Sequence, residues 1–170
     1  MLLQYCKGCR AALLATAATL ICAAAPAASA APTSVETLPC HGAPTPYRLL
    51  ITSKGVKTDH GYLVADLYGP DRHKWLADNG WLAVWQDPAN RGDETMCFYV
   101  PGPGRYALVT YHDANADGEL NLGPLGPKEG YGFSNNVRPF LTAPPLSSAL
   151  FSVSAPETHL AIRLRYPPIS

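Results

Sequence analysis

A loop in the second half of the sequence carries oxygen-bearing side chains at the spacing of a calcium-binding loop. Asp113, Asn115 and Asp117 occupy the first, third and fifth positions, and Gly118 stands at the sixth, where such a loop turns sharply. Glu119 occupies the seventh position, which contributes its backbone carbonyl oxygen. This pattern predicts a site for a hard cation that prefers oxygen ligands, and calcium is the cation that fits it.

The same loop departs from an EF-hand at its end. The twelfth position is Pro124 instead of a bidentate glutamate, and no helical pattern flanks the loop. A closing carboxylate would come from Glu129, so we predict weak structural calcium binding, with a dissociation constant on the order of 0.1–1 mM. The alternative is that the side chains hydrogen-bond to the backbone and fold the loop without a metal. The predicted metal ligands are Asp113, Asn115, Asp117, Glu119 and Glu129.

The following residues are of the types that contact ligands. Residues 127–136 read PKEGYGFSNN, which combines a charge pair, two aromatic rings and three small polar side chains. The whole loop, 112–137, is longer than compact domains usually carry without a function. The alternative is that the two aromatic rings only attach the loop to the rest of the domain. The predicted ligand-binding residues are Lys128, Glu129, Tyr131, Phe133, Ser134, Asn135 and Asn136.

Two classes of function are compatible with this loop. The first is a binding or interaction module that presents residues 112–137 to an envelope protein, a glycan or a small molecule. The second is a metal-assisted hydrolase in which His112 and Glu129 act as acid and base beside a metal at Asp113 and Asp117. The sequence contains no nucleophile elbow, histidine-rich metal triad or phosphate-binding loop, so the hydrolase has no specific support. We therefore expect the binding module.

The first thirty residues have the layout of a secretory signal peptide. Lys7 and Arg10 form a positively charged start, and residues 11–25 are an apolar run too short for a comfortable membrane span. The small residues Ala-Ser-Ala end at position 30 and supply a cleavage site. We expect a periplasmic or secreted protein that is cleaved near Ala30 and has no integral membrane segment in its mature form.

The charge of the chain argues against two kinds of partner. The full sequence holds 13 basic and 13 acidic residues, and loss of the leader removes Lys7 and Arg10 only. Eleven basic residues then face thirteen acidic ones, which gives a mature net charge of about −2. Such a chain has no electrostatic attraction for nucleic acid or for an anionic membrane surface.

The mature chain keeps two cysteines, Cys40 and Cys97, because the other three lie in the leader. In an oxidising compartment we expect these two to pair and to tie the N-terminal arm to the domain. Closing a loop of this length in the unfolded chain is worth on the order of 4 kcal/mol. The alternative is two separate buried thiols, and whether the two pair is left open at this point.

The loop must be held by a scaffold, and the sequence predicts a β-sheet domain for it. Seven short segments have the residue types of strands, and turn residues separate them. Apolar and polar residues alternate clearly in 61–69, 149–154 and 159–166. Residues 31–46 are rich in proline and form an extended arm, whereas residues 70–80 suit one short helix capped by Asp71. Seven strands in residues 47–170 favour an antiparallel β-sandwich. The predicted strands are 47–53, 61–69, 81–86, 95–100, 106–111, 149–154 and 159–166.

Three tryptophans lie close together in the sequence. Trp75, Trp81 and Trp85 could form an aromatic platform for a ligand. Large aromatic side chains contribute most to stability when they are buried, so we expect at least two of the three to fill the core.

Three pieces of sequence carry a family resemblance: YALVTYHDANADGELNLGPLGPKEGYGFSNN, the upstream strand GYLVADLY and the PGPG turn between them. Together they resemble the bacterial DUF2141 family of exported proteins, over residues 47–166. The resemblance implies an all-β, Greek-key sandwich of the transthyretin-like or carboxypeptidase-regulatory-like type. This type agrees with the one short helix and the long glycine-rich loop that the residues themselves predict. It implies no established activity. The cysteine pair and the proline-rich arm are not parts of the family pattern.

Overall fold

The computed structural model describes residues 38–124, 126–139 and 142–167. The expected signal peptide, 1–30, and the first part of the arm, 31–37, lie outside the described residues. Within the described part, no helix is long and apolar enough to cross a membrane.

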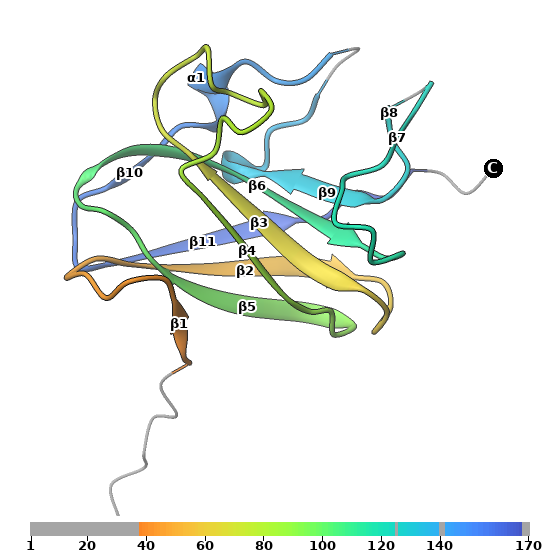
Figure 1. Ribbon diagram of the computed structural model, residues 1–170, viewed down its shortest axis with the longest axis horizontal. Helices are drawn as coiled ribbons and strands as arrows, with labels where there is room; N and C mark the ends of the chain where they lie inside the picture. Colours follow the sequence, from red (N-terminus) through yellow and green to blue (C-terminus); the bar gives the residue numbers. More distant parts are fainter. Residues whose placement is uncertain (1–37, 125, 140–141, 168–170) are drawn as a thin grey trace, which may run out of the picture. The chain divides into compact units, whose positions relative to one another are not determined.

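A five-stranded antiparallel sheet is built around β6 (Gly104–Asp113), the longest strand (Figure 1). β3 (Tyr62–Tyr68) pairs along one edge of β6, and β4 (Ala83–Pro88) pairs with β3. The other edge of β6 is shared between β10 (Phe151–Val153) at its start and β9 (Gly130–Phe133) at its end. The strand that introduces the predicted loop is therefore paired on both sides.

A second sheet holds the two ends of the described chain. Its order is β1 (Cys40–His41), β5 (Gly92–Tyr99), β2 (Arg48–Val56) and β11 (Glu157–Arg163). β2 and β5 are antiparallel, whereas β1 runs parallel to β5 and β11 runs parallel to β2. The all-β class predicted from the sequence is confirmed, but this sheet is mixed instead of wholly antiparallel.

The core lies between these two sheets. Every second side chain of β3 points into it, and residues from β2, β5, β6 and β11 meet them there. The alternation seen in the sequence of β3 is confirmed, because Leu63, Ala65 and Leu67 all belong to this core. Figure 1 shows β3 and β4 running obliquely across β2 and β5.

The outer face of the five-stranded sheet is also covered over part of its area. The short helix α1 (Leu146–Ala149) and the 3-10 turn η1 (Ser134–Asn136) lie over β6, and Leu146 and Ala149 pack there. They form a second apolar cluster with residues of β3, β6 and β9. A small hairpin of β7 (Leu122–Gly123) and β8 (Gly126–Pro127) rises from the loop beyond it.

The helix predicted for residues 70–80 is wrong. Asp71 does accept a hydrogen bond from the backbone of His73, at 2.9 Å, as a capping residue would. The segment then forms only successive three-residue turns, because Leu76 and Asn79 adopt left-handed backbone angles that interrupt a helix. The one α-helix of the described chain is α1 instead.

Two of the three tryptophans pack against the apolar clusters, as expected. Trp85 stacks on Phe98 with ring centroids 4.1 Å apart, and Trp75 packs against Tyr68 and Phe133 on the outer face. Trp81 differs, since it remains 39% exposed. One ring is therefore left at the surface.

The predicted disulfide between Cys40 and Cys97 is confirmed. The two residues are direct neighbours in the parallel pairing of β1 with β5, and their Cα atoms lie 4.4 Å apart. The bridge fastens the described end of the proline-rich arm to the edge of the mixed sheet, the role expected from the sequence.

Gly61 provides a test of the packing between β3 and β6, because it lies just before β3 and next to the end of β6. Gly61 has φ +74°, and a Cβ there would collide with the backbone carbonyl of Asp113. We expect Gly61→Ala to cost about 3–5 kcal/mol of unfolding free energy, measured by chemical denaturation. Gly55→Ala is the matched control, because Gly55 also has positive φ (+83°) but open space around it. It should cost only about 1 kcal/mol, and equal losses would contradict the proposed collision.

Candidate functional site

The calcium-like loop begins with a buried carboxylate that is bonded to the backbone. Asp113 is the last residue of β6 and is fully buried. Its Oδ1 accepts the backbone N–H of Asp117 at 3.2 Å, and its Oδ2 accepts that of Gly118 at 2.9 Å. Both oxygens of the first predicted metal ligand thus hold the turn that follows.

The other side chains of the loop form a network at its exposed tip. The Asn115 amide donates to Asp117 at 2.7 Å and to Asn121 at 3.1 Å, and the Asn121 amide donates to Asp117 at 2.9 Å. The backbone N–H of Glu119 also donates to Asp117. Hydrogen bonds from Asn121 and Asn115 hold the pKa of Asp117 below its ordinary value, because they stabilise the ionised form.

Glu129 closes the loop by accepting backbone hydrogen bonds, whereas the sequence predicted that it closes the loop as a metal ligand. It is buried, and its two carboxylate oxygens accept the N–H groups of Ala114 at 2.9 Å and Asn121 at 3.1 Å. Among the residues that the structure describes, no three acidic, histidine or cysteine side chains are grouped so that they could hold a metal ion. A bound calcium ion would have to replace amide hydrogen bonds to Asp113 or Glu129, and calcium binding stays a prediction.

His112 lies on the opposite side of the sheet from this loop. Successive residues of a strand project to opposite faces, so His112 points between the sheets while Asp113 points outward. The His112 ring is buried, with Nδ1 2.8 Å from the Tyr166 hydroxyl and Nε2 2.8 Å from the His60 carbonyl oxygen. His112 and Glu129 are each engaged in structural hydrogen bonds, and neither lies in the cleft described below.

Three of the predicted ligand-binding residues act as ties between elements. The buried Ser134 hydroxyl accepts the N–H of Leu108 and donates to the carbonyl of Ala149. The amide of Asn135 donates to two carbonyls of the segment around α1. Asn136 donates to one carbonyl of β11 and accepts the N–H of Arg163. These side chains join β6, α1 and β11, while Lys128 lies exposed on the loop.

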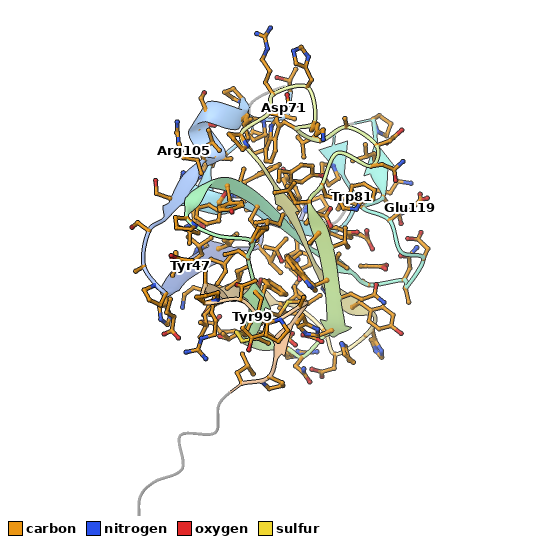
Figure 2. All side chains as sticks on the ribbon, turned by 60° about the vertical axis from the view of Figure 1, so that its left-hand side comes forward. Tyr47, Asp71, Trp81, Tyr99, Arg105 and Glu119 are labelled. Carbon is orange, nitrogen blue, oxygen red and sulfur yellow. A yellow bond between two sulfur atoms is a disulfide. The ribbon has the colours of Figure 1, made fainter. Side chains whose placement is uncertain are left out.

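Tyr131 and Phe133, by contrast, do line a cleft. The cleft has a volume of about 1070 Å³ and lies over the outer face of β3, β4, β6 and β9. Its walls come from three segments, which contribute residues 76–78 and 81, residues 118–120, 122, 124 and 126–127, and residues 139 and 142–143. Figure 2 shows Trp81 and Glu119, from two of these segments, on the same side of the molecule. The predicted loop therefore contributes a wall of the cleft.

The cleft is lined mainly by apolar and aromatic side chains. Five of the lining residues are aromatic, and the exposed side chains of Leu76, Trp81, Val84 and Leu122 belong to its lining. The most exposed of these four is Leu122, at 69%. The aromatic residues are Tyr68, Trp81, Tyr111, Tyr131 and Phe133.

A single carboxylate lies on the floor of this cleft. Asp66 is in the middle of β3, and the register places it between Val84 of β4 and Val109 of β6. Its Oδ1 is buried without a hydrogen-bond partner among the described residues. Burial raises the pKa of Asp66 from 3.8 to about 6, since the charged form is poorly solvated there.

Sequence reasoning missed Asp66, although a signal was present. The segment GYLVADLYG places Asp66 on the same face as Val64 and Tyr68, and an acidic residue in the middle of an apolar strand is uncommon. The isolated carboxylate in that strand was the feature that could have indicated the site.

The buried charge of Asp66 makes the stability depend on pH. The pKa of Asp66 is higher in the folded state than in the unfolded chain, so protonated Asp66 favours the folded state. This contribution to stability is fully present below pH 3.8 and is lost as the pH rises through about 6. At about pH 8 the cost to the folded state is on the order of 3 kcal/mol. We expect Asp66→Asn to unfold at a higher temperature than wild type at about pH 8, and the difference to shrink at about pH 4.5. A difference that does not change with pH would contradict this account.

Thermal unfolding also tests the calcium prediction. For binding with the predicted affinity, calcium at about 5 mM should stabilise the fold by on the order of 1–2 kcal/mol and raise the melting temperature. Asp117→Ala should remove the rise, while Asp71→Ala, which changes an exposed acidic residue outside the loop, should keep it. An unchanged melting temperature of wild type at several times this concentration would refute the site.

The fold and the cleft can now be compared with known proteins. A family model described as "Uncharacterized protein conserved in bacteria (DUF2141)" matches residues 51–161, which is more than half of the chain. The match extends from β2 to β11 and includes the whole loop and Cys97, but not Cys40. Comparison with curated proteins and with solved structures found no match. The chain therefore belongs to the DUF2141 family of proteins conserved in bacteria.

Proposed function

We propose that this protein is an exported binding module whose site is the cleft on the outer face of the five-stranded sheet. The observation that carries the proposal is the cleft itself. It has a volume of about 1070 Å³, and its lining is mainly apolar and aromatic. Sites for small molecules are concave, largely apolar and supplied with a few polar groups that orient the ligand. The loop 112–137 takes part through Gly118, Glu119 and Leu122 of the cleft wall and through Tyr131 and Phe133.

The ligand that suits this site is a small molecule. The exposed apolar side chains of the lining, Trp81 and Leu122 among them, would be covered by a ligand that enters the cleft. Tyr131 and Phe133 are held rigidly, because β9 pairs with β6 below them and their rings pack edge to face, with centroids 5.9 Å apart. A preformed aromatic surface of this kind loses little conformational entropy when a ligand binds.

The hydrolase alternative has less support. It requires His112 and Glu129 to face one open site, where they would act as acid and base. His112 is buried and bonded between the two sheets, whereas Glu129 is buried and bonded to amides of the loop after β6, and neither is among the described residues of the cleft. The binding module explains the loop without them.

The fold type that we propose is a Greek-key β-sandwich of the transthyretin-like or carboxypeptidase-regulatory-like kind. Two sheets that enclose one apolar core support this assignment. The loops of such sandwiches carry binding sites at little cost to the core.

A neutral fluorescent probe, N-phenylnaphthylamine, tests the binding site. We expect the purified protein to bind the probe, and Trp81→Ala and Leu122→Ala to weaken its affinity roughly five- to tenfold through loss of apolar contact. Leu82→Ala is the matched control, since Leu82 is an exposed apolar neighbour of Trp81 that lies outside the cleft. Absence of probe binding, or equal losses in all three variants, would overturn the proposal.

A further inference from the structure

We infer that the ligand of this cleft is a primary amine with an apolar body, whose ammonium group binds to the carboxylate of Asp66. This inference rests on the proposed function, in which the cleft binds a small molecule. It adds the charge of the ligand and the residue that recognises it.

The first argument is the unsatisfied carboxylate. Asp66 stands in a row across the sheet in which its neighbours Val84, Val109 and Phe133 offer no hydrogen-bond donor from their side chains. A buried polar atom without a partner is costly and is uncommon away from functional sites. An N–H group of a ligand would provide the donor that Oδ1 lacks in the described protein.

The second argument is the sign of the charges around the cleft. Within the described lining, the side chains that carry charge are the carboxylates of Asp66, Asp78 and Glu119, and no lysine, arginine or histidine accompanies them. Three negative groups without a counter-ion attract a cation and repel an anion. The net charge of the whole chain is near zero, so this asymmetry is a property of the cleft.

The third argument is the aromatic lining. The faces of aromatic rings attract cations, and five rings line the cleft that holds Asp66. The same rings give contact area for an apolar body attached to the amine. A primary ammonium suits this site better than a quaternary one, because only the primary group has N–H donors for Oδ1.

The ionisation of Asp66 should make such binding sensitive to pH. The titratable groups that surround it in the cleft are Tyr68, Tyr111 and Tyr131 from the sheet and Asp78 and Glu119 from the walls. Burial, with the nearby charge of Asp66, raises the pKa of Tyr68 to about 12 and also raises that of Tyr111, so these two phenols stay neutral. Asp66 has a pKa of about 6, and its protonation as pH falls should weaken the binding of a cation.

The experiment compares two probes of the same shape, phenethylammonium and phenethyl alcohol, by displacement of N-phenylnaphthylamine from the full chain. At about pH 8 we expect the amine to bind at least about tenfold more tightly than the alcohol, as a charge-assisted hydrogen bond would give. Asp66→Asn should remove this preference, because the neutral amide has no charge to attract the ammonium group. In wild type the preference should decrease at about pH 5, which tests Asp66 without a substitution.

The outcomes separate this inference from the proposed function. If the naphthyl probe and the alcohol bind but the amine binds no better, the inference is wrong and the binding site remains. If Asp66→Asn keeps the preference for the amine, Asp66 is not the recognition group and the inference is again wrong. If none of the three probes binds, both proposals are overturned.

Discussion

Strand β6 is paired on both edges and buried on both faces, and the remaining structure depends on that position. Its inward side chains complete the core between the sheets, and its outward side chains support α1 at one end and the cleft at the other. The pairing also sets Asp66 and Phe133 on opposite sides of Val109. A slip of one residue would exchange the two faces and destroy core and cleft together.

The long loop after β6 keeps a defined path because buried side chains bond to its backbone. Asp113 and Glu129 are both buried, and each accepts two backbone N–H groups of the loop. The buried Ser134 hydroxyl accepts the N–H of Leu108 and so ties the end of the loop to β6. A loop without regular strands or helices has many unpaired amides, and leaving them buried would cost more than the folding of the loop contributes. The most conspicuous polar residues of the sequence therefore act mainly on structure.

Asp66 differs from these residues, because its Oδ1 is buried without a hydrogen bond among the described residues and does not stabilise the fold. Its carboxylate is held between valines, and its charge destabilises the folded protein at neutral pH. Asp113, by contrast, is fully buried but bonded at both oxygens. An unsatisfied buried polar atom is costly, and such atoms are expected at functional sites, which supports the proposed role of Asp66. The cleft above it provides the setting in which a ligand could restore the missing partner.

Much of the scaffold could be predicted from the sequence, because alternation, turn residues and cysteine pairing are local or compositional signals. The two faces of β3 and the Cys40–Cys97 bridge follow from such signals. The partners of the loop side chains could not be predicted, since Asp113 and Glu129 bond to whichever amides the path of the chain brings to them. The cleft arises only when side chains from segments far apart in the chain, such as Trp81, Glu119 and Tyr131, come together over the sheet. The sequence by itself determined the strands and the residue types; the tertiary structure decided which polar groups are satisfied, because burial and hydrogen bonding depend on segments far apart in the chain.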